Sequence, residues 1–326
     1  MINISLSHTN LDAIAEEWAQ MLWKFLTDDF IFDKNGKRRH RTPYHDKMLS
    51  DIDSQQRNRK SSIQDCDEAR ENLDTFMKEY NKIVLADEEG LQKYSQKYYI
   101  AMGSKSLFKD LMIALYNRFT DEKRSYHFFE ELNVRTCPYC NREYTFTFKK
   151  GIKTRPQFDH FYDKSEYPML TVSFYNLVPS CPVCNKVKGT NPIKLNPYFL
   201  GFKTKFRIAD DNDKIMNGSQ VLKILDEKQI HLKFSNPSED EKSNIEQFGL
   251  EQLYNMHSDY VEEMIERAVS YNDAYKKELL DAFQSSDYSL MDIYDFVWGR
   301  YLDIAEQERR PLSKLTRDLL EQMEIE

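Results

Sequence analysis

Two cysteine pairs with identical spacing constrain the fold of this chain more than any other feature of its sequence. Each is a C-x-x-C motif, and residues 141–180 separate them, a gap of 40 positions; the four cysteines are Cys137, Cys140, Cys181 and Cys184. Two such pairs are typical of a tetrahedral zinc site closed by protein sulfurs, and a closed site is structural. We predict one structural Zn²⁺ here, the alternatives being chance pairs or a redox dithiol. The fifth cysteine, Cys66, falls on the apolar face of a predicted helix, so its expected role is core packing.

The bulk composition indicates a soluble chain with a sizeable core. The sequence has 326 residues, 40% of them hydrophobic and 31% charged, which suits two domains or one core with elaborations. No apolar run approaches the roughly 20 residues of a membrane-spanning helix, and the N-terminal residues lack the features of a secretory signal. We therefore expect a cytoplasmic protein without a membrane partner. A reducing cytoplasm also favours metal binding over disulfides.

Charge is distributed unevenly along the chain. The formal net charge is −8, yet residues 135–207 hold 13 Lys/Arg against 4 Asp/Glu, while the other 253 residues hold 33 against 50. A local positive field attracts phosphate even on an acidic protein. We therefore predict a nucleic-acid partner bound through its backbone phosphates, with five lysines as the contacts: Lys186, Lys188, Lys194, Lys203 and Lys205. A second basic run lies at residues 37–41. We expect it to form a solvated loop; the alternative is that it makes an additional contact to the nucleic-acid backbone.

Hydrophobic periodicity predicts an α+β protein in three regions. A small zinc-stapled centre at residues 131–210 lies between a helical N-terminal region, 1–130, and a C-terminal region of a short hairpin and helices, 211–326. Apolar residues recur at helical spacing over residues 11–26, 69–83, 107–119 and again from 245 onward. Thr9 or Asn10 is the expected cap of the first helix. Alternation predicts β-hairpins at residues 144–148 and at residues 221–225 with 230–234.

The segment around the second cysteine pair supplies the groups that phosphodiester hydrolysis needs. His160 can deprotonate water near neutral pH, because its unperturbed pKa is about 6.5. Asp159 offers a hard oxygen ligand for Mg²⁺ and Asn185 a second, neutral oxygen; few protein ligands suffice because Mg²⁺ keeps several waters. Taken singly, His160 is more often a packed or surface histidine, Asn185 a helix-terminal polar residue, and Asn176 a turn former.

A helix over residues 181–188 would keep the two metals apart. Cys181 and Cys184 at i, i+3 share one face of such a helix, and Asn185 points elsewhere because successive residues rotate by about 100°. Pro182 fits the first turn. Adjacent strand residues point to opposite faces, so alternation alone separates Asp159 from His160.

These residues and their spacing resemble the HNH, or ββα-metal, endonucleases. The similarity covers roughly residues 134–200, through Asp159-His160, Asn176-Leu177-Val178-Pro179-Ser180-Cys181, Cys184-Asn185 and Lys188-Gly189. It implies that His160 is the general base and that Asn176 fixes the loop that orients it. It also implies that Asp159 and Asn185 bind a catalytic Mg²⁺ or Mn²⁺, and that a bend at His160 brings base and metal together.

A looser similarity extends to the nucleases of Septu-type and retron-linked anti-phage systems, which are partnered with ATPases. It is carried by Asp159-His160-Phe161-Tyr162, Lys164-Ser165 and Tyr167-Pro168. That pattern has proline where this chain has Asp163, which is either a further metal-site carboxylate or a loop residue. The resemblance implies a role in antiviral defence and a regulatory protein partner that docks on the acidic helical flanks, with an ATPase as the candidate that the family suggests.

The expected function is therefore that of a metal-dependent endonuclease, with DNA favoured as its substrate. Two alternatives stay open. The same site would serve a ribonuclease acting on a structured RNA such as tRNA. The cysteine framework also suits a non-catalytic zinc module that only binds nucleic acid or protein, and such a module gives His160 no role.

Overall fold

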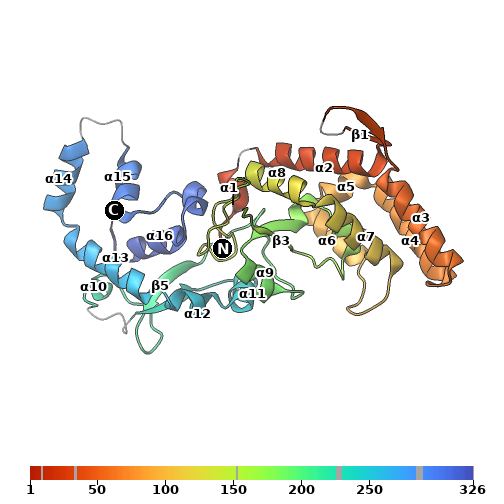
Figure 1. Cartoon of the computed structure of the whole chain (residues 1–326). Helices are drawn as coiled ribbons and strands as arrows, with labels where there is room; N and C mark the ends of the chain where they lie inside the picture. Colours follow the sequence, from red (N-terminus) through yellow and green to blue (C-terminus); the bar gives the residue numbers. More distant parts are fainter. Residues whose placement is uncertain (9, 33–34, 152, 225–229, 284–288, 326) are drawn as a thin grey trace. The chain divides into compact units, whose positions relative to one another are not determined.

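The chain is α+β, and mostly helical, with three two-stranded sheets in its described part (Figure 1). The computed structural model describes all residues except 9, 33–34, 152, 225–229, 284–288 and 326. These residues form two compact units, each built from separate stretches of chain. Unit 1 comprises Met1–Thr9, Val134–Phe146 and Ser180–Glu326, and unit 2 comprises Asn10–Asn133 and Thr147–Pro179. The predicted central region, 131–210, therefore contributes residues to both units.

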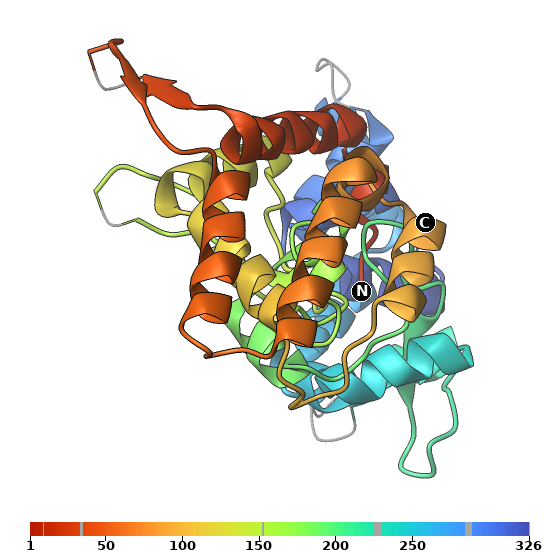
Figure 2. The same ribbon diagram turned by 90° about the vertical axis from the view of Figure 1, so that its right-hand side faces the viewer.

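Unit 2 begins with a series of helices and one hairpin and ends with a short strand, a long loop and a second strand. The helices are α2 (Leu11–Thr27), α3 (Tyr44–Arg57), α4 (Ile63–Lys78), α5 (Tyr80–Val84), α6 (Glu88–Lys97), α7 (Leu107–Phe119) and α8 (Glu122–Leu132). The remaining elements are the hairpin β1 (Phe30–Phe32) and β2 (Arg38–His40), strand β3 (Gln157–His160), the short 3-10 helices η1 (Pro168–Leu170) and η2 (Phe174–Asn176), and strand β4 (Leu177–Ser180), which pairs with β3. Figure 2 looks onto α3 and α4, with the hairpin projecting at the upper left.

The helices predicted for unit 2 are confirmed. The stretch 11–26 lies in α2 and 107–119 coincides with α7, while 69–83 is divided between α4 and α5. Asn10 occupies the N-cap position of α2 without a side-chain cap bond; Thr9 lies outside the described residues. The basic run 37–41 enters the exposed strand β2 instead of a plain loop. Cys66 is fully buried in α4, as predicted for core packing.

A buried tryptophan joins the helices of unit 2 to its loop and strands. The ring of Trp18, in α2, lies 5.0 Å from Phe119 and 4.6 Å from Phe128 by centroid, and both contacts are edge-to-face. Its indole N–H donates to the carbonyl of Val172, 2.9 Å away, in the loop between β3 and β4. Phe129 stacks on Phe158 of β3 at 4.1 Å. The loop between the two strands is therefore fixed against the helical core.

Unit 1 holds the remaining elements. They are α1 (Ile4–Ser7), α9 (Pro182–Lys188), β5 (Lys205–Ala209), α10 (Gly218–Val221), β6 (His231–Ser235), α11 (Glu239–Phe248), α12 (Leu250–Asn255), α13 (Ser258–Ser270), α14 (Asp273–Phe283), α15 (Leu290–Trp298), the 3-10 helix η4 (Ile304–Arg309) and α16 (Ser313–Gln322). The helices predicted from residue 245 onward are confirmed. Gly249, at φ +57°, ends α11, because its left-handed conformation cannot continue the helix.

The sheet of unit 1 is an antiparallel hairpin whose free edge is satisfied by side chains of α16. β5 pairs with β6, with Phe206 opposite Phe234. Asp318 accepts from the Phe206 N–H at 3.0 Å. Gln322 bonds both the N–H and the carbonyl of Ile208, at 2.8 and 3.0 Å. Helix α16 thereby covers an edge that would otherwise expose unpaired backbone groups.

Two predicted hairpins differ in the structure. Strand β6 confirms a strand near residues 230–234, but its partner is β5 and not residues 221–225. Gly218–Val221 forms helix α10, because Asn217 and Gln220 make a reciprocal capping box that favours a helical turn; Leu225 lies outside the described residues. Residues 144–148 form single bridges, one at each end, and no strand.

In the described part of the chain, none of the helices combines the length and the apolar character needed to cross a membrane.

Candidate functional site

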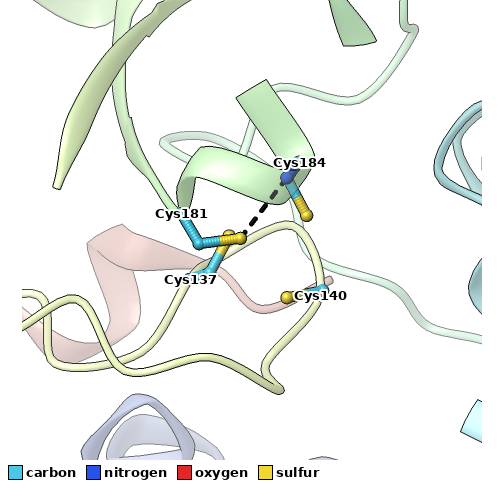
Figure 3. Close-up of side chains that lie close together, drawn as sticks. All are labelled: Cys137, Cys140, Cys181 and Cys184. Atoms are coloured by element: carbon cyan, nitrogen blue, oxygen red, sulfur yellow. Dashed lines mark hydrogen bonds between the residues drawn. The ribbon is translucent and has the colours of Figure 1, made fainter. Parts of the chain in front are cut away.

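Four buried cysteines of unit 1 gather around one point (Figure 3). Their sulfur atoms all lie within 4.8 Å of one another. A tetrahedral ion with Zn–S bonds of about 2.3 Å needs sulfurs about 3.8 Å apart, so this cluster fits zinc after small side-chain adjustments. Among the described residues, it is the one group of three or more His, Cys, Asp or Glu side chains close enough to share an ion. The sequence prediction that these cysteines can hold a zinc ion is thus supported by their placement.

The second pair sits at the start of α9, as the spacing predicted. Cys181 is the N-cap of the helix and Pro182 its first residue, where a missing N–H costs nothing. The Sγ of Cys181 accepts from the backbone N–H of Cys184 at 3.4 Å, the dashed line in Figure 3. This capping bond holds the sulfur of Cys181 against the first turn of α9, which carries Cys184.

The first pair sits on a tight turn that Asn141 closes. The N–H of Asn141 donates to the carbonyl of Cys137 at 2.7 Å, and Asn141 adopts the left-handed conformation, φ +47°. Its buried amide donates to the Thr136 hydroxyl at 2.9 Å and to the carbonyl of Gln307 at 3.1 Å. The backbone carbonyl of Asn141 accepts from the N–H of Leu312 at 2.7 Å. Asn141 therefore connects the cysteine turn to the C-terminal segment of unit 1.

Other groups of unit 1 hold the same turn from outside. The hydroxyl of Tyr254 donates to the carbonyl of Cys140 at 2.5 Å. The Nε of Arg142 donates to Nε2 of His257 at 2.9 Å. Tyr139 stacks on Phe248 at 4.6 Å. The cluster is thus embedded in the core of unit 1.

The four sulfurs influence one another's protonation. Hydrogen bonding from Cys137 and its neighbours lowers the pKa of Cys140 well below its usual value, whereas burial raises the pKa of Cys137. Cysteine binds a metal as the thiolate, so binding of an ion by this cluster would release protons.

The predicted base, His160, ends strand β3 in unit 2. Its ring is buried, and Nε2 lies 3.0 Å from the carbonyl oxygen of Thr171. Because a carbonyl only accepts, Nε2 carries the hydrogen, and in the neutral ring Nδ1 then holds the lone pair. The imidazole is therefore held in the tautomer whose basic nitrogen is Nδ1.

Asn176 ties together both ends of the loop that contains Thr171. Its fully buried amide accepts from the N–H of Tyr162 at 2.8 Å and donates to the carbonyls of Tyr162 at 3.1 Å and Leu170 at 3.0 Å. Three consecutive carbonyls of this loop thus receive side-chain donors: Leu170 from Asn176, Thr171 from His160, and Val172 from Trp18. The orientation of His160 depends on this small network.

Sequence reasoning missed Tyr116, a residue of unit 2 whose ring lies against His160. Tyr116 meets the imidazole edge-to-face at 4.6 Å, and Lys164 lies 4.9 Å from the Tyr116 ring. Burial raises the pKa of Tyr116 to about 12; the positive charge of Arg155 opposes this rise and the negative charge of Asp159 adds to it. Arg155 precedes the Asp-His motif by four positions and Lys164 follows it by four, so both were close enough in sequence to be noticed; Tyr116 comes from α7 and gave no such signal.

Asp163, where the sequence left two roles open, caps a turn. Its carboxylate accepts from the N–H of Ser165 at 2.8 Å and from the Ser165 hydroxyl. Its carbonyl accepts from the N–H of Tyr167 at 2.8 Å. These bonds favour the role of a loop residue.

The two predicted ligands of the catalytic ion belong to different units. Asp159 is buried in β3 of unit 2, and Asn185 lies on α9 of unit 1, where its backbone takes part in the helix. Their sharing of one ion stays a prediction. Along the chain the order is strand, strand, helix, through β3, β4 and α9.

The five predicted phosphate-binding lysines lie in unit 1 in unlike surroundings. Lys186, Lys194 and Lys203 are exposed. Lys205 pairs with Glu321 at 2.5 Å, which neutralises part of its charge. Lys188 is buried, 1% exposed, with its ammonium 3.5 Å from the carbonyl of Gly189. In this conformation, Lys188 is therefore the least available of the five for phosphate.

Comparison with known proteins adds no relative: no protein-family model, no curated protein and no solved structure matches this chain.

Proposed function

We propose that this protein is a metal-dependent endonuclease of the HNH type, which hydrolyses phosphodiester bonds of nucleic acid, DNA in the first place. The observation that carries the proposal is the fixed tautomer of His160. Its Nε2–H is engaged by the Thr171 carbonyl, and the loop that supplies this carbonyl is tied by Asn176. This arrangement makes Nδ1 the basic nitrogen of the neutral ring, which is what a general base requires.

In this mechanism Nδ1 of His160 accepts a proton from a water molecule as that water attacks the phosphorus. The imidazolium that forms keeps its Nε2–H bond to Thr171, so the ring does not turn during the transfer. Asp159 and Asn185 are the residues that would hold a Mg²⁺ or Mn²⁺ ion. When bound, that ion supplies neutralisation of the charge on the scissile phosphate and the departing oxygen.

The charges of unit 2 fit an anionic substrate. Lys164 lies against the ring of Tyr116, which in turn packs on His160. Arg155 lies over the rings of Tyr126 and Phe129, 5.9 and 5.6 Å from their centroids. Lys164 is therefore the cation that ring contacts link to the imidazole, and its charge favours a phosphate there.

The four cysteines have a structural part in this proposal. They hold Zn²⁺ in a closed shell and thereby fix the start of α9, which carries Asn185. A regulatory partner, with an ATPase as the candidate that the resemblance suggests, and a role in anti-phage defence complete the proposal and rest on the resemblance alone.

The decisive experiment compares cleavage of labelled DNA and RNA by the native chain and by His160→Ala, with and without added Mg²⁺. We expect Mg²⁺-dependent cleavage by the native chain and a loss of about 10²–10⁴-fold in rate for His160→Ala, with zinc content and folding retained. The matched control is His45→Ala, a change at a surface histidine of unit 2 that leaves the rate unchanged. An active His160→Ala variant would contradict the proposal.

A second part of the experiment tests the two proposed ligands of the catalytic ion. Asp159→Ala and Asn185→Ala should each weaken cleavage, with partial recovery at high Mn²⁺, and neither should release zinc. A non-catalytic zinc module predicts no cleavage by any of these chains. Cleavage of RNA but not DNA would replace the DNA substrate with RNA.

A further inference from the structure

The ring of Tyr116, in α7, contacts two groups that lie far from it in the sequence. One contact is with the buried imidazole of His160, with 4.6 Å between the ring centroids and 67° between the ring planes. The other is with the ammonium of Lys164, which lies 4.9 Å from the Tyr116 centroid. All three residues belong to unit 2. Tyr116 therefore links the predicted base to a cation.

This contact differs from the other contacts between lysine and tyrosine in the described part of unit 2. Those join residues that are one to three positions apart, namely Lys47 with Tyr44, Lys93 with Tyr94, and Lys97 with Tyr98. Such close neighbours in sequence meet without help from the fold. Lys164 and Tyr116 are 48 positions apart, so the fold itself brings the loop after β3 against α7.

The ammonium of Lys164 keeps its hydrogen-bonding capacity. Its side chain is half-buried, yet among the residues that the structure describes no carboxylate pairs with it. The neighbouring carboxylate of Asp163 bonds instead to Ser165. The face of an aromatic ring attracts an ammonium electrostatically without accepting a conventional hydrogen bond. The N–H groups of Lys164 can therefore bind a phosphate oxygen.

The separation of the two groups suits a single phosphate. Their distances to the Tyr116 centroid, 4.6 and 4.9 Å, place the imidazole centre and the ammonium no more than 9.5 Å apart. A base, its water, the phosphorus attacked by that water and an ammonium on a phosphate oxygen together reach roughly 8–10 Å. One phosphodiester can thus meet both groups.

The ring of Tyr116, and not its hydroxyl, makes these contacts. Burial raises the pKa of Tyr116 to about 12, so the phenol stays neutral near neutral pH and its ring keeps the negative face that attracts an ammonium. Phenylalanine presents the same face and the same packing surface. Leucine offers no aromatic face to either neighbour.

We propose that Tyr116 is a positioning residue of the nuclease site, which holds His160 and Lys164 at a separation that suits one phosphodiester. Lys164 is then a phosphate-binding residue of that site. The inference rests on the proposed function for the reaction itself, and it adds how the scissile phosphate is placed against the base. Precise placement matters because a displacement of about 1 Å can cost on the order of 10²-fold in rate.

The kinetic test measures single-turnover cleavage of labelled DNA with Mg²⁺ by the native chain and by its variants. Tyr116→Leu should lower the maximal rate about 10²-fold, and Tyr116→Phe should retain it. Lys164→Met should lower the rate about tenfold or more, since it removes a charged hydrogen bond to phosphate. The matched controls are Tyr98→Leu and Lys97→Met, which remove a cation–π contact of the same length, 4.9 Å, and should leave the rate unchanged.

A second measurement is independent of cleavage. In chains labelled with ¹⁵N-histidine, the NMR signals of the His160 ring are those that His160→Ala lacks. Above the ordinary histidine pKa of about 6.5, the native chain should show the Nε2–H tautomer and Tyr116→Leu a mixture of both tautomers. Inorganic phosphate should shift the His160 signals of the native chain and of Lys97→Met, but not those of Lys164→Met.

Each outcome decides one part of the inference. A folded Tyr116→Leu chain with native His160 signals, or with the native rate, would overturn the positioning role. An undiminished response to phosphate in Lys164→Met would remove Lys164 from the site, and this variant decides the matter if Tyr116→Leu does not fold. A native chain that cleaves DNA, with unaltered His160 signals in the variants, refutes this inference alone. The expected signals in a chain that does not cleave refute the nuclease alone.

Discussion

The cysteine cluster and the His160 loop are both organised by a few buried polar side chains, but in different ways. In the cluster, four sulfurs converge on one point and can be joined by an ion. In the loop, the side chains of Asn176, His160 and Trp18 each bond a different backbone carbonyl, and no shared centre exists. We therefore expect the stability of the first region to depend on a metal and that of the second on close packing. The two should consequently fail under different perturbations.

The largest effect should follow removal of a zinc ligand. Cys184→Ser leaves three sulfurs, and structural zinc supplies on the order of 10–16 kcal/mol, more than most domains have in total stability. We expect loss of bound zinc and unfolding of unit 1, measured by elemental analysis and circular dichroism. Cys66→Ala, a change at the buried cysteine of unit 2, should keep its zinc. A folded Cys184→Ser chain with one zinc would contradict the role of the cluster.

An effect of intermediate size on stability should follow removal of the Asn176 side-chain amide, which holds the loop between β3 and β4. Asn176→Ala leaves the N–H and carbonyl of Tyr162 and the carbonyl of Leu170 without this partner, which costs roughly 3 kcal/mol in the free energy of unfolding. Urea titration measures this, and zinc content should not change. Asn58→Ala is the control, since Asn58 is exposed and bonds only Ser54 through its side chain. If both variants are equally stable, the loop is not held by Asn176.

The smallest effect should appear with pH. Burial lowers the pKa of His257, and the charge of Arg142 lowers it further. A lowered pKa means that the folded state binds fewer protons than the unfolded one. The stabilisation is then complete above the ordinary pKa of about 6.5 and is lost as the pH falls through the lowered value.

Since His257 is partly exposed, solvent screening limits this loss to below about 1 kcal/mol. His257→Gln can still accept from Arg142 but does not titrate, so its melting temperature should fall less than that of the native chain between pH 7.5 and 5, both at saturating Zn²⁺. Identical pH profiles for the two chains would show that this contact does not couple the turn to pH.

Sequence spacing predicted the cysteine region well, for a physical reason. Two C-x-x-C pairs and Pro182 specify a local geometry that holds whatever surrounds it, and the structure has the sulfurs clustered and the helix starting where expected. The helices with strong apolar periodicity were predicted equally well. These features depend on interactions between residues close in sequence or of unmistakable chemistry.

The features that the sequence did not predict depend on tertiary contacts, which leave no local pattern in the sequence. β5 was missed because its free edge is satisfied by Asp318 and Gln322, more than a hundred positions away. Residues 144–148 alternate like a strand, but their aromatic residues face solvent and no strand forms. Around His160, Tyr116 arrives from α7 and could not be found from the motif.

The way in which the chain is divided between the two units determines which unit is completed first during translation. The last stretch of unit 2 ends at Pro179, so this unit is fully translated while unit 1 still lacks everything from Ser180 onward. At ribosomal rates of about 5–20 residues per second, the 40 positions between the cysteine pairs take roughly 2–8 s. During that interval the first pair has no partner pair with which to complete a four-sulfur site. Binding of zinc by all four cysteines is therefore a late event, which waits for the second pair and for the return of the chain to unit 1.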